Sequence, residues 1–240
     1  MLKFSAGNAK LSKSIHIFSL PASWSCPSAD KCSSKANRET GKIKDGPNTE
    51  FRCYAASQEA LYPSVRKQRW YNFGLLKAAK TENNMRKLIL NSIPKNASII
   101  RVHSSGDFFN ENYFTAWMNV ANQRKDILFY AYTKSLNFWV KNKRKIPKNF
   151  VLTASEGGKL DNFIEKYGLR YAKVVYSTKE AKKMKLPIDK DDSHAMENGK
   201  SFALLLHGVQ MAGSPASKAL SALKASGNGG YSRRISLKTV

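Results

Sequence analysis

Three cysteines carry the most specific chemistry in this 240-residue chain. Cys26, Cys32 and Cys53 follow the spacing C-x5-C-x20-C, in a first segment rich in Ser, Asn, Lys and turn residues. An odd number of cysteines argues against a disulfide framework, and the polar surroundings argue against buried apolar side chains. Thiolates that converge from loops bind zinc or an iron–sulfur cluster, so we predict a metal site. The spacing alone does not separate the two metals.

Two histidines could complete that site. Three thiolates leave one coordination position, and both His103 and His207 directly follow an apolar run that reads as a strand. A histidine would normally close a zinc site. In a four-iron cluster, the position could instead stay open to water, a substrate or a cofactor.

The elements that must position these residues begin after about residue 60, where short apolar runs alternate with helical patterns. The predicted strands are 99–102, 127–132, 150–153, 172–176 and 202–206, and the predicted helices are 62–79, 85–90, 113–122, 136–143, 160–167 and 179–184. Strand, helix, strand at this spacing is typical of parallel βα units, and nearly continuous apolar strands indicate a sheet buried on both faces. We predict an α/β fold with a mostly parallel sheet of about five βα units, as an open sheet or a partial barrel.

The domain organisation follows from the same pattern. We predict one α/β domain over 1–225, in which 1–60 form a loop-rich cluster-binding segment and 61–225 the βα core. Residues 226–240, with Arg233 and Arg234 after a Gly-rich run, are predicted to be a flexible basic tail.

Polar residues follow most predicted strands, and in parallel α/β folds ligands bind outside the carboxyl ends of the strands. Asp107 and Glu156 are candidates for acid–base chemistry, and Lys134 could hold a phosphate or carboxylate. A second acidic group near residue 190 could hold a divalent ion, although a solvated loop is the simpler interpretation. That group consists of Asp189, Asp191, Asp192 and His194.

The net charge points to a polyanionic partner. The chain has 41 Lys and Arg against 17 Asp and Glu, a formal charge of +24 spread along its whole length. This is well above what solubility needs, so we expect nucleic acid as the partner, with an anionic membrane surface as the weaker rival. No apolar run approaches the roughly 20 residues that span a bilayer, and no secretory signal is evident.

Three basic segments are the predicted nucleic-acid contacts. They are Lys141, Lys143, Arg144, Lys145 and Lys148; Lys182, Lys183 and Lys185; and Arg66, Lys67 and Arg69. Trp70 and Trp139 fall at apolar helical positions, which leaves Tyr54, Tyr62, Tyr71 and Tyr231 as the freer aromatics for stacking bases. No duplex-reading motif is present, so we expect binding without sequence specificity, with single-stranded DNA favoured and RNA as the alternative.

Several short motifs resemble the bacteriophage gene-product-eighty-eight family, from about Gly7 to Ser217. They are Gly7-Asn8-Ala9-Lys10-Leu11, Phe18-Ser19-Leu20-Pro21-Ala22, Cys26-Pro27-x-Ala29-x-x-Cys32, Arg52-Cys53-Tyr54-Ala55, Arg101-Val102-His103-x-Ser105-Gly106-Asp107, Tyr130-Ala131-Tyr132-Thr133-Lys134-Ser135 and His207-Gly208-x-Gln210. The resemblance implies a phage protein, which would act in the cytoplasm of the infected bacterial host. It implies no mechanism.

Cysteines ahead of a βα series also give a looser similarity to radical S-adenosylmethionine enzymes. In those proteins three cysteines hold a [4Fe–4S] cluster, and the fourth iron binds the cofactor. The spacing here differs from their usual C-x3-C-x2-C, but ligation needs convergence in space and not one spacing. The similarity favours an iron–sulfur cluster over zinc.

Three functions compete at this point. The first is an iron–sulfur protein that binds nucleic acid without turnover, which the sequence favours. The second is an enzyme whose open iron binds a small molecule or S-adenosylmethionine at the strand ends. The third and weakest is a divalent-metal nuclease using Asp107 with Asp189 or Asp191.

Overall fold

The computed structural model describes residues 1–8 and 10–229, and its elements alternate much as the sequence predicts. Their bounds in chain order are β1 Ser5–Ala6, β2 Ile15–Phe18, β3 Ser34–Ala36, β4 Ile43–Asp45, α1 Tyr54–Leu61, α2 Pro63–Ala79, α3 Glu82–Leu90, β5 Ile99–Val102, α4 Glu111–Gln123, β6 Leu128–Thr133, α5 Leu136–Lys141, a 3-10 turn η1 Lys143–Lys145, β7 Phe150–Ser155, α6 Asn162–Lys166, β8 Tyr171–Val175, α7 Thr178–Lys183, α8 Ser193–Met196, β9 Phe202–Leu205 and α9 Pro215–Ala225. Most of the predicted basic tail, from residue 230 and including Tyr231, Arg233 and Arg234, lies outside the described residues.

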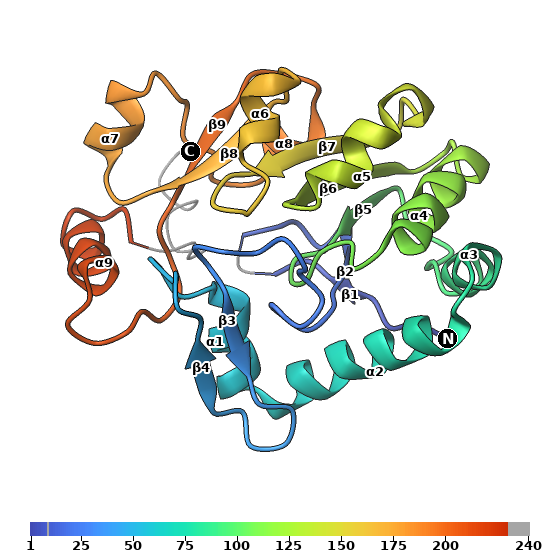
Figure 1. The fold of residues 1–240 in the computed structure, drawn as a ribbon, viewed down its shortest axis with the longest axis horizontal. Helices are drawn as coiled ribbons and strands as arrows, with labels where there is room; N and C mark the ends of the chain where they lie inside the picture. Colours follow the sequence, from blue (N-terminus) through green and yellow to red (C-terminus); the bar gives the residue numbers. More distant parts are fainter. Residues whose placement is uncertain (9, 230–240) are drawn as a thin grey trace, which may run out of the picture.

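The main sheet runs in the order β1-β2-β5-β6-β7-β8-β9, and every neighbouring pair except β1–β2 is parallel. The predicted α/β class and mostly parallel sheet are therefore confirmed. Beyond the five strands predicted in the βα core, β2 adds a sixth parallel strand from the N-terminal segment. The strands follow one another in space as they do in sequence, and Figure 1 shows the helices arranged around them.

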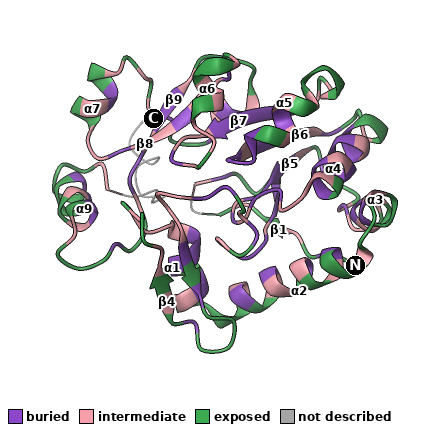
Figure 2. Cartoon of the chain, viewed as in Figure 1, coloured by how far each residue is buried: buried purple, intermediate pink, exposed green. Residues whose placement is uncertain are grey.

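The two faces of the sheet are covered differently. Alternate residues such as Ile100, Phe129 and Leu152 pack against α2 to α5 on the outer face. Their neighbours Tyr130 and Val151 face the inner side, where Ala195 of the short α8 joins them. Figure 2 shows the central strands as mostly buried. Because the strands from β2 to β9 are parallel, their carboxyl ends lie at one edge of the sheet.

Several helix starts are set by local capping. The side chains of Thr81, Asn110 and Ser177 each accept a hydrogen bond from a backbone N–H in the first turn of the following helix. Helix α1 has no such side-chain cap, because Cys53 occupies the N-cap position. None of the helices within the described residues has the length and apolar character needed to span a membrane.

Candidate metal centre and pocket

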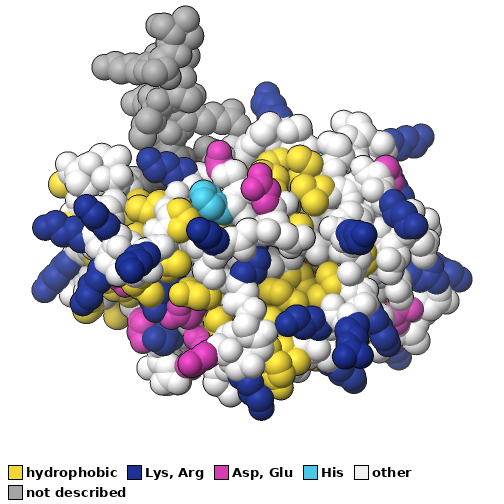
Figure 3. Space-filling view, turned by 90° about the horizontal axis from the view of Figure 1, so that it is seen from above, with side chains coloured by type: hydrophobic (Ala, Val, Ile, Leu, Met, Phe, Trp, Pro, Cys, Tyr) yellow, Lys and Arg dark blue, Asp and Glu magenta, His cyan; other side chains and the backbone are white. Residues whose placement is uncertain are grey.

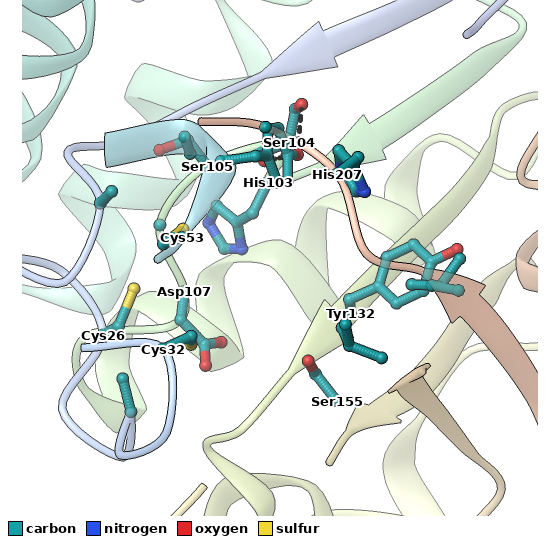
Figure 4. Close-up of a pocket in the computed structure, with 18 of the residues that line it drawn as sticks. Cys26, Cys32, Cys53, His103, Ser104, Ser105, Asp107, Tyr132, Ser155 and His207 are labelled. Atoms are coloured by element: carbon teal, nitrogen blue, oxygen red, sulfur yellow. Dashed lines mark hydrogen bonds between the residues drawn. The ribbon is translucent and has the colours of Figure 1, made fainter. Parts of the chain in front are cut away.

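The three cysteines lie at one end of a cavity of about 400 Å³ at the carboxyl ends of the strands. Cys26 and Cys32 come from the loop between β2 and β3, and Cys53 comes from the start of α1. Figure 4 shows them on one side of the cavity, with His103 and Asp107 beside them. All three are free thiols and half-buried. All three cysteines therefore line the same cavity, although Cys53 lies far beyond Cys32 in the chain.

The thiols influence one another electrostatically. Burial raises the pKa of Cys26 well above its ordinary value, and the charges of Asp107, Cys53 and Cys32 raise it further. Burial also raises the pKa of Cys53 to about 11, with Cys32 as the next cause. Cys26 and Cys53, whose pKa values are raised, would need a nearby cation to become thiolates together. Among residues 1–8 and 10–229, however, no three His, Cys, Asp or Glu side chains are grouped closely enough to hold a single ion.

The loop that carries Cys26 and Cys32 is fixed from two sides. Backbone hydrogen bonds join it to the turn after β7: Lys31 N donates to Gly157 O at 3.1 Å, and Lys159 N donates to Ser28 O at 2.9 Å. A Cβ on Gly158 would lie 2.9 Å from Ser28 O, so this close approach needs glycine.

The other side of the loop is held by Glu59 of α1, which is fully buried. Its Oε1 accepts hydrogen bonds from Ala22 N at 2.8 Å and from Arg69 Nη1 at 2.9 Å, with Ser105 Oγ at 3.3 Å. Burial raises the pKa of Glu59, while the Arg69 charge opposes that shift. One carboxylate thus joins the cysteine loop, α2 and the turn after β5. Glu59 was not predicted as a site residue, because nothing in its local sequence pattern marks it.

Cys53 is positioned by residues that follow β9, the last strand of the sheet. Gln210 Oε1 accepts from Arg52 N at 2.8 Å, and Gln210 Nε2 donates to the Arg52 and His207 carbonyls at 3.2 and 3.0 Å. The Tyr54 and His207 rings lie 4.7 Å apart, and a Cβ on Gly208 would lie 2.7 Å from Tyr54 Cβ. Two motifs that lie far apart in the sequence therefore form one junction beside the cavity.

His103 sits at the end of β5 in a conformation that is rare for a residue with a side chain, with φ of 74°. It is 3% exposed, and its Nε2 lies 2.9 Å from the Tyr113 hydroxyl, while Nδ1 has no hydrogen-bond partner within the described part of the chain. Burial, together with the Arg101 charge, lowers the pKa of His103 to about 3, so the ring is neutral at pH 7. Backbone strain and an unpartnered nitrogen at a cavity are typical of functional residues.

His207, the other predicted fourth ligand, also lines the cavity. Its Nδ1 donates to the Leu205 carbonyl at 3.0 Å, and burial lowers its pKa to about 4. Both histidines are thus neutral side chains at the mouth, and in Figure 4 His103 is the one beside the cysteines.

The three acid–base candidates have different surroundings. Asp107 lines the cavity, but its carboxylate accepts from Phe108 N, Thr133 Oγ1 and Lys134 N at 2.6 to 2.8 Å. Burial raises its pKa, and these hydrogen bonds oppose the shift. Asp107 is therefore held rigidly beside Cys26, where it can orient a ligand.

Lys134 and Glu156 both have partners within the protein. The Lys134 ammonium donates three hydrogen bonds, to Ser155 O, Ser155 Oγ and Glu156 O, which occupy all its donors. Lys134 is thereby bonded to the carboxyl end of β7, and its ammonium has no N–H left to donate to a phosphate. Glu156 pairs with Lys173 and does not line the cavity.

The acidic group near residue 190 is not a solvated loop. Asp192 is fully buried on the inner face of the sheet, where Arg101 Nη1 and Lys10 Nζ each lie 2.6 Å from its carboxylate. Tyr130 and Tyr132 donate to the same carboxylate at 3.1 Å. Burial disfavours its ionised form, but Arg101 and Lys10 outweigh this and hold the pKa of Asp192 below its ordinary value. These partners lie far away in sequence, which is why the local pattern suggested exposure.

Comparison with known proteins identifies a family and two similar proteins. The gene product 88 family matches residues 2–225. The chain belongs to this phage family. It is similar to the Gene 88 proteins of Mycobacterium phage L5 and Mycobacterium phage D29, with 29% and 30% identity over 90 residues. Each alignment covers 34% of this chain and 38% of the relative, well under two thirds of the relative's length. No solved structure matches the chain.

The predicted nucleic-acid contacts of this gene product 88 chain divide into exposed and buried groups. All members of the first two basic segments are exposed, and so is Lys67. Lys141 pairs with Glu111 at 2.8 Å. Figure 3 shows Lys and Arg side chains spread over one face of the molecule.

Arg66 and Arg69 are buried, contrary to the prediction of a surface contact. Arg69 binds Glu59, Gln58 and the Ala55 carbonyl. Arg66 donates to the carbonyls of Arg38, Glu39 and Glu59. The two guanidinium groups have fixed internal partners because α2 packs these positions against α1 and the loop between β3 and β4.

Proposed function

We propose that this protein is an iron–sulfur enzyme, in which Cys26, Cys32 and Cys53 hold a [4Fe–4S] cluster and the adjoining cavity takes a small-molecule cofactor. The observation that carries the proposal is the convergence of three thiols from two loops at one end of a cavity where parallel strands end. We propose a cluster in place of one zinc ion, because tetrahedral zinc needs its ligands grouped closely around Zn–S bonds of about 2.3 Å. No such close group of three occurs among the described residues.

The cavity favours an enzyme over a cluster that only braces the fold. Its volume of about 400 Å³ falls in the range of small-molecule sites. A purely structural cluster needs no adjoining cavity. When bound, a cluster with three cysteine ligands would supply one open iron position and an electron. The looser similarity to radical S-adenosylmethionine enzymes makes S-adenosylmethionine the proposed cofactor.

The residues of the chain would hold and orient that cofactor. The turn from His103 to Asp107 forms the wall next to the cysteines, and Asp107 is already fixed by three hydrogen bonds. Its carboxylate can orient an ammonium group without moving. Tyr132 and Leu204 on the inner face provide a partly apolar surface for the remainder of a ligand.

A direct test is S-adenosylmethionine cleavage by the anaerobically reconstituted and chemically reduced protein. We expect cleavage by the natural chain and by Lys148→Ala, a surface control, and none by Cys53→Ser. An iron-loaded protein that neither binds nor cleaves S-adenosylmethionine would overturn the enzyme proposal and leave the non-catalytic binding protein.

Nucleic acid as a partner stays a second proposal, supported by the formal charge of +24. It is compatible with an enzyme, since a polynucleotide could be the substrate or could only localise the protein. The three free thiols suit a reducing compartment, which supports the cytoplasm of the infected host as the place of action.

A further inference from the structure

The surface formed by α2 and the β3–β4 hairpin gathers exposed aromatic rings. Among the described residues, the large apolar side chains that are exposed include three aromatics: Trp24 at 45%, Tyr62 at 56% and Tyr71 at 44%. Tyr62 and Tyr71 lie at the start and in the middle of α2, and Trp24 packs against Trp70 of α2 with ring centroids 5.5 Å apart. Trp24, Trp70 and Tyr71 are therefore neighbours, whereas Tyr62 lies nine residues before Tyr71, on the opposite side of the helix, and is left out of the site.

Cations lie over these rings. The Lys35 ammonium is 4.8 Å from the centre of the Trp24 ring, and the Arg38 guanidinium is 5.1 Å from that of Trp70. The Lys3 ammonium is 4.9 Å from the centre of the Tyr71 ring. Trp24, Trp70 and Tyr71 therefore each have a positive charge beside the ring.

The surface has almost no acidic residues. Helix α2 contains no Asp or Glu over its 17 residues, and the β3–β4 hairpin contains only Glu39 and Asp45, of which Asp45 pairs with Arg52. The exposed Lys67 lies one turn before Tyr71 on the same face of α2. Acidic partners therefore meet uncompensated positive charge here.

The Trp24 ring is held in place before any partner binds. Its Nε1 donates to the Ala36 carbonyl at 3.0 Å, which joins the ring to β3. Because little side-chain freedom remains to be lost, a base that stacks on this ring meets a preorganised surface.

From these observations we propose that the surface of Trp24, Tyr71, Lys3, Lys35, Arg38 and Lys67 binds a single-stranded polynucleotide, with bases stacked on the rings and phosphates beside the cations. A single strand fits better than a duplex, because duplex bases are stacked on one another and cannot reach an aromatic side chain. The inference rests on the proposal of a polynucleotide partner and does not depend on iron. Trp24 lies two residues before Cys26, so a strand bound here would pass next to the cysteine loop.

Fluorescence anisotropy of labelled 20-nucleotide strands on the full chain tests this site. The probes are oligo(dT), oligo(U) and a duplex of equal length, each measured over a series of salt concentrations. We expect both single strands to bind more tightly than the duplex, and affinity to fall with salt.

Two ring variants locate the site. Tyr71→Ala and Trp24→Ala should each weaken single-strand binding about 5- to 150-fold, which corresponds to one stacked base of about 1–3 kcal/mol. Trp24→Phe should recover most of the affinity, and circular dichroism checks that each variant folds.

The double variant Lys35→Ala/Lys67→Ala tests the cations. It should weaken binding and lower the slope of log K against log salt by roughly 1.4, at about 0.7 per phosphate contact.

The matched control is Lys95→Ala/Lys125→Ala, which removes two exposed charges just before β5 and β6, outside the predicted basic segments. It should weaken binding less than the Lys35/Lys67 pair does. Equal losses in the two pairs, or ring variants that bind normally, would overturn this site while leaving a polynucleotide partner in place. No binding of any probe would overturn the partner itself, and binding by Cys53→Ser would show that iron is not needed.

Discussion

At the carboxyl ends of the strands, polar groups surround a cavity. At the amino ends, polar side chains find their hydrogen-bond partners in the backbone of the turns. The carboxyl mouth contains three free thiols, the strained His103 and the fully buried Glu59. At the amino ends, Asn149 just before β7 donates to the Ala121, Arg124 and Ile127 carbonyls at 2.9 to 3.1 Å. The difference supports the proposal that the carboxyl ends hold the functional site, and it leaves the amino ends a structural role.

The largest effect should come from Glu59, the residue that holds the cysteine loop. Glu59→Ala leaves the buried Arg69 without its charged partner, so we expect a loss of about 3–5 kcal/mol in the free energy of unfolding. Urea denaturation measures it, and iron retention after reconstitution should fall as well. A loss below about 1 kcal/mol would show that Glu59 does not hold the loop.

Asp192 should give the next largest effect and a pH dependence. Because its folded-state pKa lies below the unfolded one, the unfolded chain takes up the proton first as pH falls. The stabilisation is therefore full above the unfolded value of about 3.9 and is lost as pH falls through the folded value. Asp192→Asn should be less stable by about 3 kcal/mol at pH 7 and should lose less stability on acidification. Parallel pH profiles for the two proteins would contradict this account.

Substitution of Asn149 tests whether the amino ends of the strands affect stability alone. Asn149→Ala removes an amide that contacts three carbonyls, so we expect a loss of about 2 kcal/mol in the free energy of unfolding. Iron content and S-adenosylmethionine cleavage should stay at the level of the natural chain. If either falls in the folded variant, the two ends are not separate in function.

Gly168 and Gly106 both have positive φ, so alanine substitutions at the two positions can be compared directly. A Cβ on Gly168, before β8, would have no neighbouring atom within 4 Å, so Gly168→Ala should lower stability by about 1 kcal/mol. At Gly106 a Cβ would lie 2.5 Å from Ser25 Oγ and 2.6 Å from Leu20 Cβ. Gly106→Ala should therefore cost about 1–2 kcal/mol more, measured by the same denaturation. Equal losses would mean that the loop at Ser25 moves freely.

The fold and part of the site could be predicted from local patterns. Strand and helix periodicity located the βα core, and strand-end positions correctly placed His103, Asp107 and His207 at one cavity. The short strand β2 was not predicted as part of the sheet, because four residues in a turn-rich segment carry little periodic signal.

Burial of charge could not be predicted, since it depends on partners distant in sequence. Asp192 is buried because Lys10 and Arg101 reach it from the N-terminal half of the chain. Arg69 looked like a surface cation because Glu59 belongs to a helix that was not predicted. Lys134 has its partners in the turn after the next strand, at Ser155 and Glu156.

The central claim is that three thiols hold one cluster, and iron analysis with Mössbauer spectroscopy of anaerobically reconstituted protein tests it most directly. We predict about four irons per chain in one [4Fe–4S] centre. Cys26→Ser, Cys32→Ser and Cys53→Ser should each lose most of that iron, while Lys148→Ala keeps it. A natural chain that takes up no iron, or holds it equally well without these cysteines, would contradict the account.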